Sequence, residues 1–339
     1  MELREELRKS ILSKLGGESD VLDGFYAAED TKEAILAVMI SGRHLLLEGP
    51  PGTGKTTLAK ILATYLQPME AVEGCRYNCD PESPQCPDCL NKKTGHGTVT
   101  IPAKERFIRV QGSPELMPED LLGDIDPVIA MQFGIRDPRA FTPGKIQRAH
   151  RKIMFIDELN RVSERTQNTL IQVLEEKTTT IASFDINVLV DTIVIATQNP
   201  QEYAGADRIS ETLGDRFERI RIDYPSEEQE TAILKRYARS FEGVKFSDNL
   251  LSEIVRMSQF TRTMEDISRP ASVRASIAIF EQAQAIAQVR GRNVVSQSDI
   301  EEAARISLEG RVEISPGSRY SDTPGYLFNQ LVKKSQESN

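Results

Sequence analysis

Gly49-Pro50-Pro51-Gly52-Thr53-Gly54-Lys55-Thr56 joins a short apolar run, 44–48, to a helical pattern that begins at Lys55. Its three glycines let the backbone turn tightly and approach an anion, toward which the N–H groups of the loop and of the following helix point. In this pattern the lysine reaches the β- and γ-phosphates of a nucleotide, and the threonine hydroxyl reaches Mg²⁺. The stretch, extended to Thr57, therefore predicts a site for ATP and Mg²⁺.

Two adjacent acidic residues, Asp157 and Glu158, follow the apolar run 152–156. A carboxylate at a strand end can hold Mg²⁺, usually through water, and a second carboxylate can polarise the water that attacks the phosphate. The same pair is typical of a solvated acidic turn, but the phosphate loop upstream favours catalysis. We expect Asp157 to hold Mg²⁺ and Glu158 to assist hydrolysis.

Three further polar positions are candidate site residues. Asn199 follows another apolar run and could hold the attacking water in line, although asparagine before proline is also a common turn residue. Arg216 precedes the last predicted strand, where it could reach a neighbouring subunit's γ-phosphate or pair with Asp215 at the surface. Arg274 opens a helix in the C-terminal segment and could fold over the same phosphate, and Arg269 is its rival.

Apolar runs alternate with helical patterns up to about residue 225, and helical patterns alone follow. This order predicts an α/β domain with a central parallel sheet, followed by a small all-α lid domain. The strands of the sheet are expected at 44–48, 107–110, 152–156, 192–196 and 219–222. The expected divisions are an N-terminal helix at 1–18, the α/β domain at 19–225, the lid at 226–312 and a partly ordered tail at 313–339. Three segments stand out within the α/β domain: a cysteine-rich insertion at 70–104, a helical insert at 113–145 and a hairpin at 178–190.

The composition is that of an ordinary soluble protein. The chain has 339 residues, of which 39% are hydrophobic and 27% charged, and its net charge is -9. An acidic surface disfavours general binding to nucleic acid, although a ring can confine basic groups to a pore. No apolar run approaches the ~18 residues of a membrane helix, and the N-terminus does not have the pattern of a signal peptide. We expect a cytoplasmic protein that binds no membrane.

All four cysteines lie in one short segment, at Cys75, Cys79, Cys86 and Cys89. The last two have the paired spacing of zinc knuckles, and four thiolates suit a closed tetrahedral Zn²⁺ site that would fold an otherwise coreless loop. Two disulfides, an iron–sulfur cluster and unligated thiols are the alternatives. The spacing favours structural zinc.

The order of these motifs resembles that of AAA+ ATPases. More narrowly, the chain is similar to MoxR ATPases and to the ATPase subunit of magnesium chelatase. The segments that carry this resemblance are 111–116, 121–123, 140–144, 157–161 and 196–200, together with a loop at 73–81 that is similar to one in the chelatase subunit.

The resemblance implies a hexameric ring with ATP at the subunit interfaces. It implies that Glu158 is the catalytic base, Asn199 the first sensor, Arg216 an arginine finger acting in trans and Arg274 the second sensor. It also implies that 24–25 contact adenine, that the insert and hairpin face the pore or a partner, and that a separate von Willebrand A-type protein is that partner. The segments 209–214 and 269–274 depart from the usual family pattern, and the second departure leaves both arginines open as the second sensor.

The leading functional hypothesis is a MoxR-like chaperone ATPase that remodels a partner or aids metal insertion. A chelatase motor subunit is the second hypothesis, suggested by the cysteine loop. A helicase-type nucleic-acid motor is the third, and the acidic charge counts against it. The fourth is a nucleotide-gated scaffold that seldom turns over, against which Glu158 counts.

Overall fold

The computed structural model describes residues 1–17, 20–90, 97–135, 137–181, 186–199, 209–320 and 324–337. It divides the chain into two compact units. One unit contains Met1–Gly49 and Gly54–Ile222, and the other contains Pro50–Thr53 and Asp223–Asn339.

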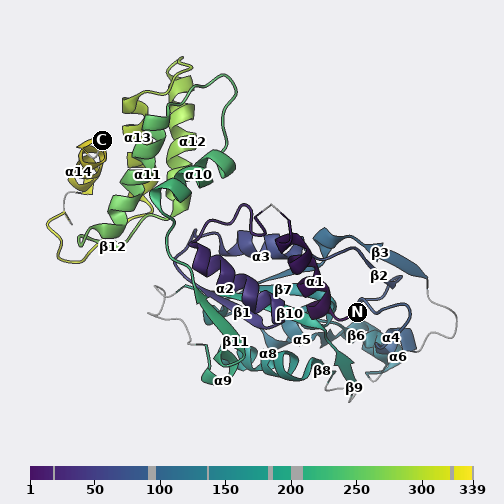
Figure 1. Cartoon of the computed structure of the whole chain (residues 1–339). Coiled ribbons are helices and arrows are strands. Elements are labelled where there is room, and N and C mark those ends of the chain that lie inside the picture. Colours follow the sequence, from purple (N-terminus) through teal and green to yellow (C-terminus); the bar gives the residue numbers. More distant parts are fainter. Residues whose placement is uncertain are drawn as a thin grey trace. The chain divides into compact units, whose positions relative to one another are not determined.

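The first unit is built around a parallel sheet of five strands in the order β11-β1-β10-β7-β4 (Figure 1). The strands are β1 (His44–Glu48), β4 (Phe107–Gln111), β7 (Lys152–Asp157), β10 (Thr192–Gln198) and β11 (Phe217–Arg221). Each central strand is almost continuously buried because helices cover both faces, which is why the strands read as apolar runs in the sequence. The structure confirms the predicted α/β fold with its central parallel sheet.

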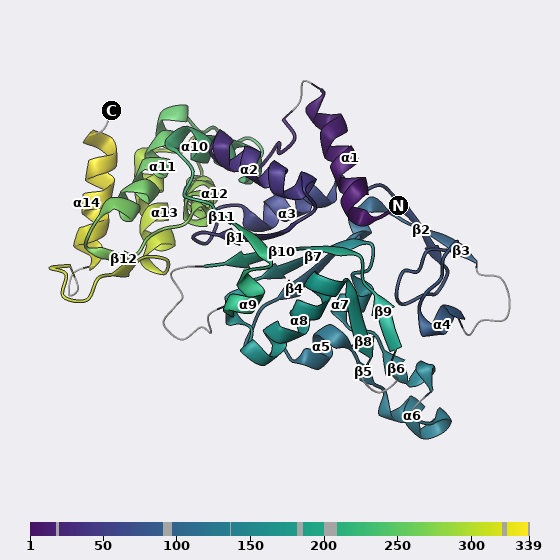
Figure 2. The same ribbon diagram turned by 60° about the horizontal axis from the view of Figure 1, so that its bottom comes forward.

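Helices cover both faces of the sheet (Figure 2). Alternate strand residues point into two separate cores, so that Leu45 and Leu47 face one helical layer and Leu46 faces the other. The first layer is formed by α1 (Leu3–Leu15), α2 (Glu29–Ile40) and α3 (Lys55–Ala63). The second contains α5 (Pro118–Leu122), α7 (Lys145–Arg148), α8 (Glu164–Glu176) and α9 (Glu211–Gly214). The N-terminal helix, expected as a separate segment at 1–18, is thus part of the first core.

The three segments singled out by the sequence leave the sheet as small elements of their own. The cysteine-rich insertion lies between the paired strands β2 (Met69–Val72) and β3 (Thr98–Ile101) and contains α4 (Pro87–Leu90). The insert contains α5, β5 (Asp124–Ile125), α6 (Pro127–Phe133), η2 (Pro138–Ala140) and β6 (Phe141–Thr142). Since β5 pairs with β6, the two form a narrow ribbon that carries α6. The expected hairpin is β8 (Thr178–Ile181) and β9 (Ile186–Leu189). Short turns η1 (Ala103–Glu105) and η3 (Leu159–Arg161) complete the unit.

The second unit is helical around one apolar core. Its elements are α10 (Glu227–Tyr237), α11 (Asp248–Thr263), β12 (Ile267–Arg269), α12 (Val273–Val289), α13 (Gln297–Glu309), β13 (Glu313–Ile314) and α14 (Pro324–Glu337). The capping box predicted at Ser226 and Gln229 is present at the start of α10.

The C-terminal segment corrects one expectation. Instead of a partly ordered tail, 324–337 is a helix that packs on α11 and α13. Leu327, Phe328 and Leu331 are buried in the core of this unit, because they fall on one face of the helix. Pro324 stands in its first turn, where proline is tolerated. In the described part of the chain, no helix combines the length and apolarity required to cross a bilayer.

Candidate nucleotide site

The glycine-rich loop leaves β1 and turns directly into α3. Gly52 and Gly54 have φ of 81° and 84°, the left-handed conformation that glycine adopts most easily. Gly49 allows a close approach of chains, because a Cβ there would stand 2.2 Å from the carbonyl oxygen of Ile222. Lys55 opens α3 and its ammonium donates a hydrogen bond to the Gly49 carbonyl at 2.7 Å. The loop thus has the form that a phosphate cradle requires.

The remaining loop residues follow the same plan. The Thr53 hydroxyl donates to the carbonyl oxygen of Pro50 at 3.0 Å, which closes the turn. Thr56 and Thr57 lie in the first turn of α3, at the helix N-terminus where N–H groups are free for an anion. The ring of Phe25 packs beside Gly54, since a Cβ built there would stand 3.5 Å from it.

Asp157 ends β7, and both of its carboxylate oxygens have partners. Oδ1 accepts a hydrogen bond from the Thr197 hydroxyl at 2.8 Å, and Oδ2 accepts one from the Arg109 guanidinium at 2.6 Å. These partners come from the two strands on either side, β10 and β4. The carboxylate is therefore oriented at the carboxyl edge of the sheet, where ligands bind in open α/β sheets.

Glu158 is held by its backbone and by its side chain. It has a left-handed backbone, with φ of 57°, and its N–H donates to the Thr197 hydroxyl at 2.8 Å. Its Oε2 accepts hydrogen bonds from Arg161 at 3.0 Å and from Gln111 at 3.3 Å. The side chain is 30% exposed, so water can reach it.

The strand order brings the predicted residues to one edge. Because β10 lies between β1 and β7, the residue after β10, Asn199, stands between the phosphate loop and the acidic pair. The N–H of Gly49 donates to the Gln198 carbonyl at 3.2 Å, which fixes the loop beside this strand. Adjacent strands are ~4.8 Å apart, so β1 and β7 are separated by about 10 Å, space for a phosphate chain. Pro200 lies outside the described residues.

Arg216 lies at the opposite edge of the sheet. Phe217 pairs with His44 and Arg221 with Glu48, so the amino end of β11 is remote from the loop of its own chain. The Arg216 guanidinium donates to the Glu175 carboxylate at 2.6 Å and to the Thr212 carbonyl. Its Nε is buried and has no partner among the described residues.

The two rival arginines of the helical unit differ in their surroundings. Arg269 pairs with Glu313 at 2.8 Å across the β12–β13 ladder, and both side chains are more than half exposed. Arg274 lies in the first turn of α12 and is exposed. Within the described part of the chain, its guanidinium forms no ion pair or hydrogen bond.

The four cysteines gather at one point, as their spacing predicts. Their sulfur atoms all lie within 4.8 Å of one another, and Cys79, Cys86 and Cys89 are buried. Cys75 Sγ and Cys86 Sγ are 3.7 Å apart, well beyond the ~2.05 Å of a disulfide. Five backbone N–H groups donate to three of these sulfurs, from residues 77, 79, 85, 86 and 89. Such donors stabilise thiolates, the form in which cysteine binds metal.

The pKa shifts of the four cysteines show that their thiol groups interact closely. Hydrogen bonds from the Cys79 and Cys86 side chains lower the pKa of Cys75. The interaction with Cys75 raises the pKa of Cys79 and of Cys86, and burial raises the pKa of Cys89 to about 12. A divalent ion would allow all four to ionise.

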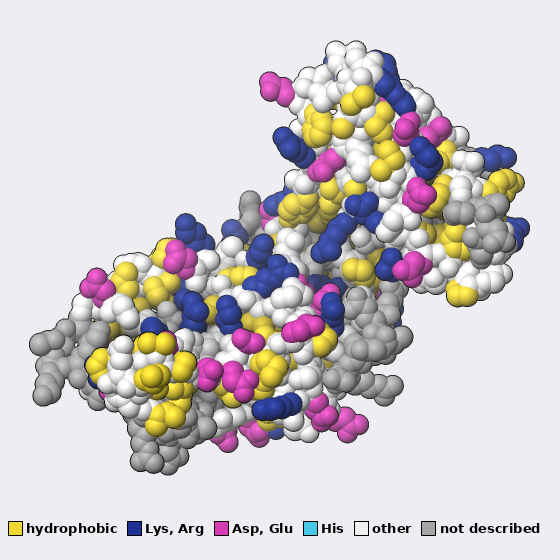
Figure 3. All heavy atoms as spheres, turned by 180° about the vertical axis from the view of Figure 1, so that it is seen from behind, with side chains coloured by type: hydrophobic (Ala, Val, Ile, Leu, Met, Phe, Trp, Pro, Cys, Tyr) yellow, Lys and Arg dark blue, Asp and Glu magenta, His cyan; other side chains and the backbone are white. Residues whose placement is uncertain are grey.

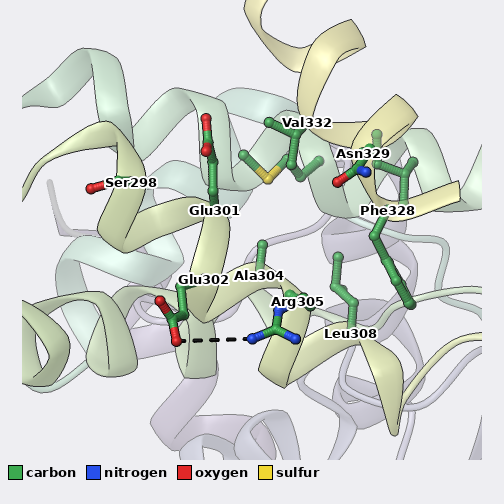
Figure 4. Close-up of a pocket in the computed structure, with 11 residues that line it drawn as sticks. Ser298, Glu301, Glu302, Ala304, Arg305, Leu308, Phe328, Asn329 and Val332 are labelled. Carbon is green, nitrogen blue, oxygen red and sulfur yellow. Dashed lines mark ion pairs between the residues drawn. The ribbon is translucent and has the colours of Figure 1, made fainter. Parts of the chain in front are cut away.

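The helical unit contains a hollow of about 340 Å³ whose lining differs from that of the nucleotide site (Figure 4). It lies between α13 and α14, where Leu308, Phe328 and Val332 supply an apolar wall. Glu302 and Arg305 lie 3.9 Å apart at its side. Glu301 and Glu302 also line it, but they lie on α13 and no glycine-rich loop borders the hollow, so we do not assign it to the nucleotide.

Several site residues escaped the sequence analysis. Arg109, Gln111 and Thr197 orient the acidic pair. The sequence placed them in a strand or in a segment of the family resemblance, but it gave none of them a role in the site. Gly112 was also missed: a Cβ there would stand 2.2 Å from the Glu158 carbonyl oxygen. The polar residues Arg109 and Gln111, followed by Gly112 at the end of an expected strand, could have indicated site residues. No local pattern showed that this strand lies beside the strand that ends in Asp157.

Comparison with known families identifies this arrangement. Residues 89–219 match the ATPase family associated with various cellular activities (AAA), and residues 259–324 match the AAA lid domain. Residues 23–78 match magnesium chelatase, subunit ChlI. The chain belongs to the AAA+ ATPases.

Curated relatives place this AAA+ chain in the branch of MoxR and the magnesium-chelatase ATPase subunit. It is 28% identical to the uncharacterized protein YeaC of Bacillus subtilis over 84% of this chain and 82% of that protein. It is 25% identical to a magnesium-chelatase subunit ChlI homolog of Methanocaldococcus jannaschii, over 85% and 84%. It is also 25% identical to the chaperone MoxR1 of Mycobacterium tuberculosis, over 89% and 76%.

Among solved structures, the AAA+ chain resembles a RuvB mutant of Thermotoga maritima. The TM-score is 0.51 at 18% sequence identity, and the match covers 84% of this chain and 71% of the other. At this level the likeness shows the shared fold and nothing further.

Proposed function

We propose that the protein is a MoxR-like motor that uses ATP hydrolysis to remodel or mature a partner protein or complex. The observation that carries this proposal is the junction between the acidic pair and the insert. The N–H of Gly112 donates to the Asp157 carbonyl at 2.7 Å, and the insert begins at the next residue. This hydrogen bond connects the acidic pair to the start of the insert, the segment that would contact a partner. A shift of the acidic pair during hydrolysis would therefore be transmitted to the insert.

The residues at the carboxyl edge would divide the work as follows. The loop amides and Lys55 bind and orient the phosphates. Mg²⁺, which Thr56 and Asp157 would hold, supplies charge neutralisation when it is bound with the nucleotide. Glu158 accepts a proton from the attacking water, and Asn199 keeps that water in line.

The sheet register supports a role for Arg216 in trans. Arg216 precedes β11, so it lies about five residues, or roughly 16 Å, from the carboxyl edge of its own sheet. A guanidinium there is out of reach of the phosphates of its own chain. In a ring it could serve the neighbouring subunit, where it would neutralise charge in the transition state.

Arg274 is the better candidate for the second sensor. It is exposed at the start of α12, whereas the Arg269 guanidinium already pairs with Glu313. An arginine at this position has its five N–H donors available for a phosphate.

The tip of the insert supports contact with another protein. The exposed hydrophobic residues of α6 and of the segment after it are Val128, Met131, Phe133 and Ile135, with exposed fractions of 50–88%. Figure 3 shows hydrophobic side chains gathered on the end of the molecule that carries α6. Contiguous apolar surface of this kind marks interaction sites. A separate von Willebrand A-type protein is the partner that we propose.

We further propose that the four cysteines hold a structural Zn²⁺. Four sulfurs within 4.8 Å of one another, with amide donors around them, match a closed four-thiolate site. Elemental analysis of the purified chain should give one zinc per chain, and the four thiols should become titratable only after the metal is removed.

The proposed function is tested by trapping the ATP state. Glu158→Gln should bind Mg·ATP as the wild type does but lose hydrolysis by about 10²–10⁴-fold, the contribution of a general base. In ATP, the immobilised variant should retain a partner that elutes in ADP. Lys55→Ala is the matched control, because it should capture nothing in either nucleotide. Equal capture by both variants would contradict ATP-dependent remodelling.

A magnesium-chelatase-type motor is the second candidate. It is favoured by the family match at 23–78, which includes the first part of the cysteine loop, and by relatives named as chelatase subunits. The identity of the captured partner distinguishes the chelatase-type motor from the MoxR-like motor. Capture of a chelatase-type subunit, together with ATP-dependent metal insertion into a tetrapyrrole, would favour the chelatase hypothesis. A nucleic-acid motor would instead show hydrolysis stimulated by DNA, with a steep salt dependence.

A further inference from the structure

We infer that the cysteine site is a metal-dependent clamp that fastens two inserted elements together: the β5–β6 ribbon that carries α6, and the β8–β9 hairpin. The inference rests on the proposed zinc site and states what that metal does. It assigns the metal to the partner-facing elements of the molecule rather than to the nucleotide site.

The clamp is visible as a small apolar core, separate from the cores on either side of the sheet. Its buried members are Val72, Tyr77, Cys79, Cys86, Cys89, Phe141 and Val188. Phe141 comes from β6 of the ribbon and Val188 from β9 of the hairpin. Two elements far apart in the sequence thus share one core, and the cysteine loop is the third wall of it.

Polar contacts and helix packing reinforce this connection. The Asn78 amide, from the cysteine loop, donates to the Arg148 carbonyl at the end of α7 at 2.9 Å. The short helix α4, which carries Cys89, packs against η2 just before β6. The loop therefore contacts the chain on both sides of the ribbon strand that contains Phe141: η2 of the insert before it and the end of α7 after it.

The cysteine loop has little of its own to keep it in this shape. Between β2 and α4, the only large buried hydrophobic side chain besides the cysteines is Tyr77. A loop with so small a core depends on a cross-link, and here the cross-link would be four metal–thiolate bonds. Removal of the metal should release the wall against which Phe141 and Val188 pack.

A second connection between the insert and the hairpin does not involve the metal, and it limits how much of the structure should loosen when the metal is lost. Gln147 is fully buried on α7, and its amide donates to the Leu122 carbonyl at 2.6 Å and to the Thr179 hydroxyl at 3.4 Å. This contact joins the base of the insert to β8 without the cysteines. Loss of metal should therefore loosen the ribbon and the outer hairpin strand, while α5, α7 and the sheet stay folded.

Hydrogen exchange of the full chain, followed by mass spectrometry, tests the clamp. The probe is the native protein before and after zinc is released with a thiol-directed mercurial and removed with a chelator. Peptides that cover 124–142 and 186–189 should exchange at least ten times faster after release. Peptides that cover the glycine-rich loop and β10 should be unchanged, and the Kd for Mg·ATP should stay within twofold.

Phe141→Ala tests the same contact without touching a sulfur. It should keep one zinc per chain yet show the fast exchange in the hairpin peptide. Met131→Ala is the matched control, since this residue is 88% exposed on α6 and outside the clamp; it should leave the hairpin unchanged.

The outcomes separate the clamp from the proposals on which it rests. Faster exchange confined to the cysteine loop, with zinc bound beforehand, overturns the clamp alone. Protein that contains no metal and four titratable thiols overturns the zinc site and the clamp together. Failure to bind Mg·ATP before any treatment overturns the motor proposal, and leaves the clamp to be judged by the exchange data.

Discussion

Glu158 combines an unusual backbone with an engaged carboxylate. Its left-handed φ of 57° is uncommon outside glycine, costs on the order of 1–3 kcal/mol, and is the kind of strain that gathers at functional sites. The Glu158 N–H donates to the Thr197 hydroxyl, and the Glu158 carbonyl lies so close to Gly112 that only glycine fits there. Because Arg161 and Gln111 occupy one carboxylate oxygen, we expect water to approach the other.

The choice between Arg274 and Arg269 also belongs to single residues. Arg274→Ala should slow ATP turnover by about 10–100-fold, because a charge-assisted hydrogen bond contributes ~1.5–3 kcal/mol. Arg269→Ala should change turnover less than about twofold, since it removes only an exposed ion pair of ~0–1 kcal/mol. Steady-state phosphate release from both variants decides the assignment, and the reverse order of effects would transfer the sensor role to Arg269.

At the scale of elements, β4 is the strand that would link hydrolysis to movement of the insert in the proposed motor. Its side chains at Arg109 and Gln111 contact the two acidic residues, and its end is the root of the insert. The sequence predicted the strand itself from the run 107–110, although β4 is a partly buried strand at the edge of the sheet. It could not predict that β4 lies beside β7, since strand order depends on tertiary packing.

The difference between local patterns and contacts of distant segments also explains which other features could be predicted from the sequence. The phosphate loop and the cysteine cluster were predictable, because a fixed local spacing specifies each. The contacts of the cluster with Phe141 and Val188 were not, because they join segments far apart in the chain. Helix α14 was not predicted, although three apolar residues that are buried in the structure, Leu327, Phe328 and Leu331, fall on one helical face.

A buried histidine makes the β1–β10 pair sensitive to acid. His44 Nδ1 accepts a hydrogen bond from the Val194 N–H, and burial lowers the pKa of His44 to about 3. Below the unfolded pKa of ~6.5 the unfolded chain binds a proton that the folded chain does not, so stability falls as the pH drops from 6.5 toward 3. His150 shows the same direction, with burial lowering its pKa to about 4.

Urea unfolding between pH 7 and 4.5 measures this effect. The wild type should lose up to ~1.4 kcal/mol per pH unit per buried histidine in the free energy of unfolding. His44→Gln, which keeps a hydrogen-bond acceptor but cannot be protonated, should show a shallower slope. An identical slope in the variant would mean that His44 does not remain neutral in the folded state.

At the scale of the whole molecule, the proposed role of Arg216 requires more than one copy of the chain. Arg216 precedes β11 at the edge of the sheet opposite the glycine-rich loop, so it would act on the nucleotide of a neighbouring subunit. Arg216→Ala should assemble and bind ATP like the wild type, yet hydrolyse it about 10³-fold or more slowly, as in related phosphoryl transfer. Sedimentation with ATP and phosphate release measure the two properties.

Mixing two inactive variants separates action in trans from action in cis. An Arg216→Ala subunit keeps its own Glu158, and a Glu158→Gln subunit offers an intact Arg216 to its neighbour. Mixed assemblies should therefore regain hydrolysis that neither variant shows alone. No recovery in assemblies shown to be mixed would remove Arg216 from the finger role.

The central claim is that Mg·ATP binds in the loop that begins at Gly49, beside Lys55. Calorimetric titration of the folded chain with Mg·ATP tests it most directly. We expect saturable binding at one site per chain, abolished by Lys55→Ala in a variant that keeps the wild-type unfolding temperature. Absence of saturable binding to well-folded wild type, or unchanged binding to Lys55→Ala, would contradict it.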